Sequence, residues 1–503
     1  MVVVLGLGLQ LYFIVSAILF FSDHFVFFSA ASNLLSLVVI VHIINDKTNP
    51  YYKLAWTIPV TLLPIFGTIM YIYVKLELGT HMMRRRTEEL VQKTSQFIPQ
   101  EAEILEELSL KDKKESNLAE YMKKFAGYPI YKNTYAEYYP LGDDMYKRMK
   151  TELLKAKEFI FMEFFIVERG EMWDGILEIL EQKVKEGVDV RFMYDGMCSL
   201  MLVPYRYPKV LEAKGIKCKM FSPIKPILST VQNNRDHRKI LVVDGHTAFT
   251  GGVNLADEYI NKFVKYGHWK DTGVMLKGDA VKSFTMMFLQ VWNITEKEEG
   301  DYRSLIKYDF PELEPLSKSN VDGYAMPYGD SPFDSENVGQ TVYLDFLNRA
   351  ERYVHIMTPY LIIDNEMTNA LTYAAKRGVE VIIIMPHVPD KVYAYLLARS
   401  YYSELIEAGV KIYEYTPGFV HAKCFVSDGM RAAVGSINLD YRSLFLHFEC
   451  GCYFYGSPVV DSVEEDIQDT LKKCQLITLE DCKKFSRVKK LIGLILRLFA
   501  PLM

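Results

Sequence analysis

The sequence lacks paired cysteines and a strong net charge. Its seven cysteines in 503 residues are odd in number and none lies in a C-x-x-C pair. A zinc ribbon and the disulfide framework of a secreted protein are therefore disfavoured, and we expect free thiols in a reducing compartment. The net charge of -5 is small for this length. Nucleic-acid binding needs a basic face, so we expect no nucleic-acid partner.

Charge is also missing from three long runs near the N-terminus. Residues 2–21, 25–44 and 54–74 contain no Asp, Glu, Lys or Arg. Each run is close to the roughly 20 residues that cross a bilayer. No basic start or cleavage site of a secretory signal precedes them. We predict that residues 1–75 form a transmembrane anchor of two to three helices, since the first run also suits a re-entrant or interfacial helix.

Basic residues set the expected orientation of this anchor. Lys75, Arg84, Arg85 and Arg86 follow the third run. The positive-inside rule then predicts a multi-pass protein of the cell membrane whose remaining chain is cytoplasmic. Residues 485–503 combine basic with large apolar side chains and predict a basic amphipathic helix. Such a helix either lies in the lipid interface or packs on the globular body, and both readings stay open.

The cytoplasmic part divides by composition. Residues 76–128 are charged and helix-prone and predict a solvated helical connector. Residues 129–294 and 324–484 each contain a strand, a helix and a second strand joined by short glycine turns, which is typical of parallel pairing in an α/β fold. Residues 295–323 are acidic and irregular, as in a linker. We therefore expect two homologous α/β lobes with mixed sheets flanked by helices.

A doubled motif gives the sharpest signal. Each copy contains a His, a Lys two residues on, an Asp five residues later, and then G-[GS]-x-N. The first copy is His237, Lys239, Asp244 and Asn254. The second copy is His421, Lys423, Asp428 and Asn438. Each is followed by a segment that starts with an acid, Asp271 or Glu449. Two copies at one spacing make coincidence very improbable.

These residue types suit a phosphodiester substrate. His and Lys two apart on a strand share a face, so two facing lobes supply two imidazoles and two cations. We expect the lysines to neutralise the non-bridging oxygens, with Asn254 and Asn438 donating hydrogen bonds. One histidine attacks phosphorus and forms a covalent phosphohistidine. The other protonates the leaving alkoxide and then activates the incoming alcohol or water.

Carboxylates are expected to support the histidines. Each His needs a fixed tautomer, and Asp271 and Glu449 are the candidate acceptors, each reaching the His of the opposite lobe. Asp244 and Asp428 belong to the motif, yet we expect them behind the strand, where they hold the backbone. The lysines supply the positive charge and no His/Cys/Asp set has metal-ligand spacing, so neither a metal nor a cofactor is expected. For His447, which lies near the motif, we expect a solvent or supporting role.

At these residues the chain resembles the phospholipase D superfamily, and within it the bacterial cardiolipin synthases. The resemblance covers essentially the whole chain. It is carried by GGVNLADEY at 251–259, HWKDTG at 268–273, GFVHAKCFVSDG at 418–429 and GSINLDYRS at 435–443. Residues 49–67 are also similar to the anchor region of that family.

The resemblance implies a substrate and roles for the two histidines. It implies phosphatidyl transfer between two phosphatidylglycerol molecules, which gives cardiolipin and glycerol at a bacterial membrane containing anionic lipid. His237 would be the nucleophile and His421 the general acid/base, an assignment that the symmetry of the lobes does not allow from the residues alone. The alternatives are a membrane-bound phosphodiesterase that hydrolyses phospholipid and an inactive lipid-binding scaffold. No feature indicates the oligomeric state.

Overall fold

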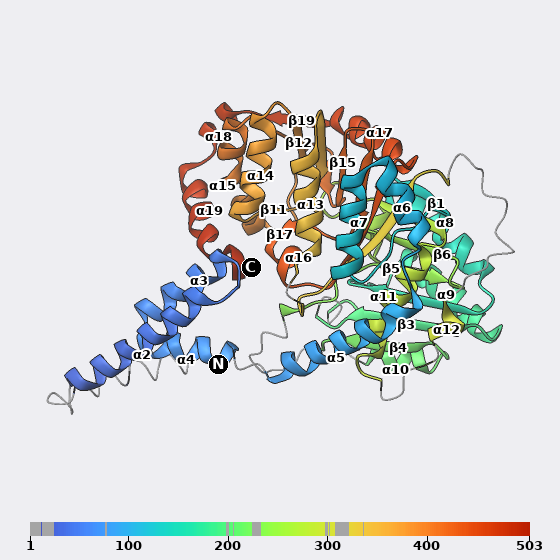
Figure 1. Ribbon diagram of the computed structural model, residues 1–503, viewed down its shortest axis with the longest axis horizontal. Helices are drawn as coiled ribbons and strands as arrows, with labels where there is room; N and C mark the ends of the chain where they lie inside the picture. The colour runs from blue at the N-terminus through green and yellow to red at the C-terminus, as the bar shows by residue number, and fades with distance from the viewer. Residues whose placement is uncertain are drawn as a thin grey trace.

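The protein consists of two α/β lobes with a group of N-terminal helices that projects from one side (Figure 1). The computed structural model describes residues 12, 25–75, 78–197, 201–204, 206–223, 233–296, 300, 302–306, 321–334 and 336–502. The first apolar run and most of the predicted linker lie outside these residues. The described cysteines are free thiols, as expected, and Cys198 lies outside the described part.

The N-terminal group contains α2 (Phe25–Asn45), α3 (Pro50–Leu62) and α4 (Pro64–Lys75). The third apolar run is divided between α3 and α4. Pro64 has no N–H and disfavours a helical conformation at the residue before it, so α3 ends at Leu62 and α4 begins at the proline. Gly67 then lies against the Pro59 carbonyl, where a Cβ would come within 2.3 Å of the oxygen.

Three helices follow this group: α5 (Leu78–Thr94), α6 (Ala102–Lys111) and α7 (Lys113–Phe125). The segment is helical as predicted, but one of its faces is buried. Glu115 of α7 is fully buried and accepts hydrogen bonds from Arg349 (2.6 Å) and Arg431 (2.5 Å) of the second lobe. The connector is therefore not fully solvated but packs on the second lobe.

The first lobe is built on a seven-stranded mixed sheet in the order β1-β8-β6-β5-β2-β3-β4. As predicted, β2 and β3 are parallel. The strands are β1 (Thr134–Tyr139), β2 (Phe159–Phe164), β3 (Asp189–Asp195), β4 (Lys217–Phe221), β5 (Ile240–Val243), β6 (Thr247–Gly251) and β8 (Gly273–Gly278). The helices are α8 (Gly142–Lys155), α9 (Glu171–Lys185), α10 (Tyr207–Glu212) and α11 (Val281–Asn293).

The second lobe is an eight-stranded sheet that repeats this order when it is written from β9: β9-β18-β16-β15-β10-β12-β13-β19. The additional strand is β19, at the edge next to β13. Its strands are β9 (Tyr324–Asp330), β10 (Tyr353–Met357), β12 (Glu380–Pro386), β13 (Lys411–Tyr415), β15 (Cys424–Ser427), β16 (Arg431–Gly435), β18 (Glu449–Tyr455) and β19 (Cys474–Ile477). Its helices include α13 (Val338–Arg349), α14 (Asn365–Lys376), α15 (Val392–Glu407), α16 (Tyr441–Phe445), α17 (Val459–Leu471), α18 (Leu479–Lys484) and α19 (Arg487–Phe499). The matching strand order confirms the predicted duplication.

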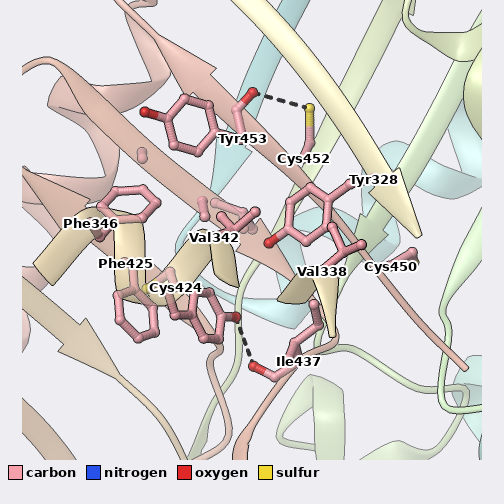
Figure 2. Packing of buried hydrophobic residues seen from close by; sticks show 14 of the residues in the cluster. Tyr328, Val338, Val342, Phe346, Cys424, Phe425, Ile437, Cys450, Cys452 and Tyr453 are labelled. Atoms are coloured by element: carbon pink, nitrogen blue, oxygen red, sulfur yellow. Dashed lines mark hydrogen bonds between the residues drawn. The ribbon is translucent and has the colours of Figure 1, made fainter. Parts of the chain in front are cut away.

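Aromatic packing fixes β15, the strand that lies between Lys423 and Asp428 of the second motif. Phe425 is buried, stacks on Tyr343 at 3.9 Å between ring centroids and contacts Phe346. Figure 2 shows this region, with Phe425 and Phe346 close to Tyr453 of β18. Burying such rings contributes about 1.5–3 kcal/mol each. The core therefore holds the motif strand rigidly from behind.

The two lobes join next to the motifs. β7 (His268–Lys270) of the first lobe pairs in parallel with β14 (Gly418–Val420) of the second. A single bridge links Asp236 to Phe448 in the same way. Each contact lies within three residues of a motif histidine, so the sequence repeat brings both motifs to one interface.

Candidate active site

The two motif histidines lie in extended segments that lead into β5 and β15. The sequence placed His and Lys on the strand itself, but the strands begin only after the lysines. The backbone N–H of His237 donates to the Phe448 carbonyl (2.9 Å), and that of His421 donates to the Lys270 carbonyl (2.7 Å). Each histidine is therefore held by the opposite lobe.

A carboxylate from the opposite lobe contacts each imidazole. His237 Nδ1 lies 2.7 Å from Glu449 Oε1, and His421 Nδ1 lies 2.6 Å from Asp271 Oδ2. This is the cross-lobe pairing expected from the sequence. When Nδ1–H donates to a carboxylate, the Nε2 lone pair is left free. Both imidazoles can then present Nε2 to a substrate.

The G-[GS] step of each motif holds these carboxylates. A Cβ at Gly252 would come within 2.0 Å of Asp271 Oδ1, so only glycine fits beside that carboxylate. In the second lobe the equivalent position is Ser436, whose hydroxyl donates to Glu449. The difference between Gly and Ser in the two motifs therefore follows from the shape and reach of the two acids.

Both motif lysines are buried. Lys239 and Lys423 each donate to the carbonyl of the histidine two residues earlier. Burial lowers the pKa of Lys239 to about 8 and that of Lys423 to about 7, although Glu449 and Asp271 partly oppose the shift. A buried ammonium without a full counter-charge is unfavourable, and an anionic ligand would relieve that cost.

Burial also disfavours charge on the histidines and on Glu449. It lowers the pKa of His421 to about 4 and that of His237 well below its ordinary value, with nearby lysines adding to both shifts. Burial raises the pKa of Glu449 to about 8, and the Lys239 ammonium opposes this rise. The imidazoles are therefore neutral near pH 7, and the Lys239 ammonium favours the carboxylate form of Glu449.

Asp244 and Asp428 do not contact the histidines. The carboxylate of Asp244 accepts hydrogen bonds from the backbone of 157–159, and that of Asp428 from the backbone of 351–353, at 2.7–3.0 Å. Both residues have positive φ, 49° and 56°. Asp tolerates this left-handed conformation better than most residues. Their geometry is that of turn and strand-end supports, as the sequence analysis expected.

The two motif asparagines line the same cavity as the histidines. Asn254 accepts from the backbone N–H of Ile166 (3.0 Å), and its Nδ2 donates to the Tyr259 hydroxyl (2.8 Å). The Oδ1 of Asn438 is buried and has no hydrogen-bond partner within the described chain. Both amides are thus engaged by protein, since Asn438 also hydrogen-bonds the Asp440 carboxylate, and the atom left unpaired is the acceptor oxygen of Asn438.

The cavity has a volume of about 530 Å³ and brings the two motifs together. Trp269 and Tyr259 form a wall beside His421, each with its ring centroid 5.4 Å from the imidazole. Residues from several other elements complete the lining. They include Phe165, Arg235, Glu258, Lys265, Tyr360, Asp390, Lys391, Arg442, His447 and Ala500. The cavity is thus partly aromatic and partly charged.

Sequence reasoning missed Arg235 and underrated His447. Both line the cavity and are more than nine-tenths buried. Arg235 lies only two residues before His237, and that spacing was the available signal. The ligand atoms of His237, His447 and Glu449 lie within 4.8 Å of one another, a grouping with metal-ligand chemistry that motif spacing did not reveal. It arises only where the lobes meet.

Two protein families match the chain. Residues 149–292 and 343–471 match the family described as cardiolipin synthase, PLD-like domain. The chain belongs to this family. Residues 34–75 match the family described as phospholipase D-nuclease N-terminal, which covers α3, α4 and most of α2. The predicted resemblance to the cardiolipin synthases is therefore confirmed for both lobes.

Relatives within the cardiolipin synthase family cover nearly the whole chain. An uncharacterized protein of Streptococcus mutans is 47% identical over 92% of this chain and 99% of its own length. A cardiolipin synthase of Halalkalibacterium halodurans is 31% identical over 94% of each chain. Cardiolipin synthase 2 of Bacillus anthracis is 31% identical over 91% of this chain and 88% of its own.

One solved structure shows the same fold. The phosphatidylserine synthase of Haemophilus influenzae superimposes with a TM-score of 0.57 at 14% identity. The match covers 77% of this chain and 98% of that protein. The likeness is one of fold, and it extends over both lobes of the cardiolipin synthase family member described here.

Proposed function

We propose that the protein is a cardiolipin synthase that transfers a phosphatidyl group from one phosphatidylglycerol to another and releases glycerol. One observation carries this proposal: two buried imidazoles, one from each lobe, share a cavity and each has Nδ1 against a carboxylate of the other lobe. Two poised Nε2 atoms are what a two-step transfer through a covalent intermediate requires. Membership of the cardiolipin synthase family supports the choice of lipid substrate.

The first step forms the covalent intermediate. Nε2 of His237 attacks phosphorus, an N–P bond forms, and the P–O bond to the head-group glycerol breaks. His421 donates a proton from Nε2 to the departing glycerol oxygen. In the empty site His421 is neutral, so the negative charge of the bound phosphodiester has to raise its pKa. The lysines, Lys239 and Lys423, stabilise the equatorial oxygens in the transition state.

The second step reverses these roles. The primary hydroxyl of a second phosphatidylglycerol gives its proton to Nε2 of His421, its oxygen bonds to phosphorus, and the N–P bond breaks. One phosphodiester replaces another, so the exchange needs no nucleotide and no metal in this scheme. The aromatic wall of Trp269 and Tyr259 beside His421 suits the neutral glycerol that leaves and the glycerol that enters.

Asymmetry between the lobes supports His237 as the nucleophile. Burial raises the pKa of Glu449, its partner, to about 8, but the Lys239 ammonium and the Ser436 hydroxyl oppose that rise and favour the carboxylate that keeps Nδ1–H and frees Nε2; the first lobe has Gly252 in place of Ser436. His421 has the aromatic wall on its side, where a leaving alcohol would sit.

The N-terminal helices and the C-terminal helix support attachment to a membrane. In the described part of the chain, no helix is identified as long and apolar enough to cross a bilayer. The proposal of a multi-pass anchor with cytoplasmic lobes rests on the apolar runs and the basic residues after them. Large apolar side chains of α2 and α19 are exposed, among them Leu34, Val38, Leu491 and Leu498. The end of α19 leads to Ala500 in the cavity lining.

Product analysis tests the function directly. The purified protein in phosphatidylglycerol vesicles is expected to give cardiolipin and glycerol in equal amounts. Phosphatidic acid without cardiolipin would instead show a hydrolase, which is the main alternative. No product at all from protein that binds anionic vesicles would show an inactive lipid-binding scaffold. Flotation of the protein with anionic vesicles, resistant to high salt, is expected if the apolar helices insert.

A further inference from the structure

Two buried side chains of the cavity have hydrogen-bonding atoms that the described protein does not use. Arg235 is 1% exposed; its Nη1 donates to the Ser222 carbonyl (2.8 Å), but Nε and Nη2 have no partner in the described chain. His447 is 7% exposed, and neither ring nitrogen has a hydrogen-bond partner there, although Nδ1 lies 3.9 Å from Glu449 Oε1. Buried polar atoms are normally hydrogen-bonded, and leaving them unpaired is unfavourable. Both residues line the cavity, so a ligand can supply the missing partners.

These two residues and Arg442 are held together by backbone hydrogen bonds. The N–H of His447 donates to the Arg442 carbonyl (2.9 Å), and the N–H of Phe448 donates to the Arg235 carbonyl (2.8 Å). Arg442 also lines the cavity. The His447 ring centroid is 5.5 Å from that of His237. The cluster therefore borders the reacting phosphorus of the proposed mechanism.

The cluster has the chemistry of an anion site. The carboxylate of Asp195 lies 3.6 Å from Arg235 Nη1. Burial raises the pKa of Asp195 to about 7, which weakens its hold on the guanidinium near neutral pH. Arg442 has Asp440 nearby, and that carboxylate caps α16 through the backbone N–H of Ser443 (2.9 Å). Guanidinium groups with free N–H atoms bind phosphate oxygens in a two-pronged manner.

We propose that Arg235, Arg442 and His447 form a second anion subsite that binds the phosphodiester of the acceptor phospholipid. This inference rests on the proposed cardiolipin synthase function. The product of that reaction has two phosphodiesters joined by a three-carbon glycerol. The second phosphate must therefore lie one glycerol away from the first, and the His447 ring of the cluster lies 5.5 Å from that of the nucleophile.

The subsite gives a reason why a lipid alcohol is used in preference to water. Holding the acceptor phosphate places its glycerol hydroxyl next to His421 and the phosphohistidine, which raises its effective concentration there. Water and free glycerol carry no phosphate and gain nothing from the cluster. The subsite therefore affects transfer to phosphatidylglycerol and not the formation of the phosphohistidine.

The test compares two reactions of one enzyme. Exchange of labelled glycerol into phosphatidylglycerol needs the donor site and a neutral acceptor, and cardiolipin formation also needs an acceptor phosphate. The variants are Arg442→Met and His447→Phe, the second of which keeps a ring against Phe165. In each variant we expect the ratio of cardiolipin formation to glycerol exchange to fall about tenfold to hundredfold, because a change of that size corresponds to the loss of one charge-assisted hydrogen bond. Arg235→Lys, which keeps the charge but loses the fork, should lower the ratio too.

Lys265→Met is the matched control, because Lys265 is a cation of the same cavity that lies 3.8 Å from the Glu258 carboxylate. It should leave the ratio unchanged. An unchanged ratio in both Arg442→Met and His447→Phe would overturn the subsite, as would an equal fall in Lys265→Met. A wild-type enzyme that exchanges glycerol but makes no cardiolipin would instead overturn the proposed function, so the two failures are distinguishable.

Discussion

Removing the buried charge of Lys423 should stabilise the protein and abolish its activity. Lys423 is 1% exposed, and burial lowers its pKa from 10.5 to about 7. The charged form is therefore disfavoured in the folded state. One pKa unit corresponds to about 1.4 kcal/mol, so folding near pH 7 carries a cost of about 4 kcal/mol for this side chain. Lys423→Met removes that cost and loses about 1 kcal/mol for the hydrogen bond to the His421 carbonyl.

The pH dependence gives the sign of the effect. The unfolded chain binds the lysine proton below its ordinary pKa of 10.5, whereas the folded chain binds it only below about 7. The advantage of Lys423→Met is therefore small above pH 10, grows as the pH falls towards 7, and is constant below that. We expect a net gain of about 3 kcal/mol near pH 7, and about 1 kcal/mol or less near pH 9.5.

Thermal unfolding in detergent at several pH values is the assay, with cardiolipin formation measured in parallel. Lys270→Met is the control, since Lys270 is equally buried but bonds to the Asp466 carboxylate (2.7 Å), and its loss should destabilise the protein at every pH. A Tm of Lys423→Met that is lower than wild type, or a gain that does not change between pH 6 and 9.5, would refute the reasoning. So would retained cardiolipin synthesis, because the lysine is expected to hold the phosphate.

Three further predictions concern the histidines, the acids and the pH profile. Replacing either His237 or His421 by Ala should lower cardiolipin formation by about a thousandfold or more. When wild-type enzyme is mixed with phosphate-labelled phosphatidylglycerol and the reaction is stopped with alkali, the label should be on the peptide that contains residue 237. A label on the peptide that contains residue 421 would reverse the roles. Asp244→Asn should lower the free energy of unfolding by about 2 kcal/mol, because the Asp244 carboxylate accepts hydrogen bonds from three backbone N–H groups. The kcat of the folded fraction should not change. A large loss of kcat would contradict the supporting role. The pH profile of kcat/KM should peak between about pH 7 and 8. On the acid side, protonation of Glu449 removes the acceptor of His237, and on the alkaline side, deprotonation of Lys239 and Lys423 removes the cations. Glu449→Gln should flatten the acid limb, and a flat wild-type profile from pH 5 to 9 would rule this explanation out.

The sequence alone was sufficient for the repeat, the fold class and the chemistry. Motif spacing and the strand–helix–strand pattern are local properties, readable over a few tens of residues. They predicted parallel β2–β3 and β10–β12 pairing and two facing lobes. The pairing of each His with an acid of the other lobe also followed, because a doubled motif implies a symmetric arrangement. That inference spans 212 residues between His237 and Glu449.

Only the tertiary structure decided what each side chain meets. The burial of Glu115 depends on neighbours that the local pattern does not specify. Arg235 and His447 looked like ordinary residues beside a motif, and the lobe interface left their nitrogens without partners in the cavity. Hydrophobic periodicity and motif spacing report which face a residue lies on. Whether a buried polar atom is paired depends on groups brought from far along the chain, and the proposed acceptor subsite rests on such unpaired atoms.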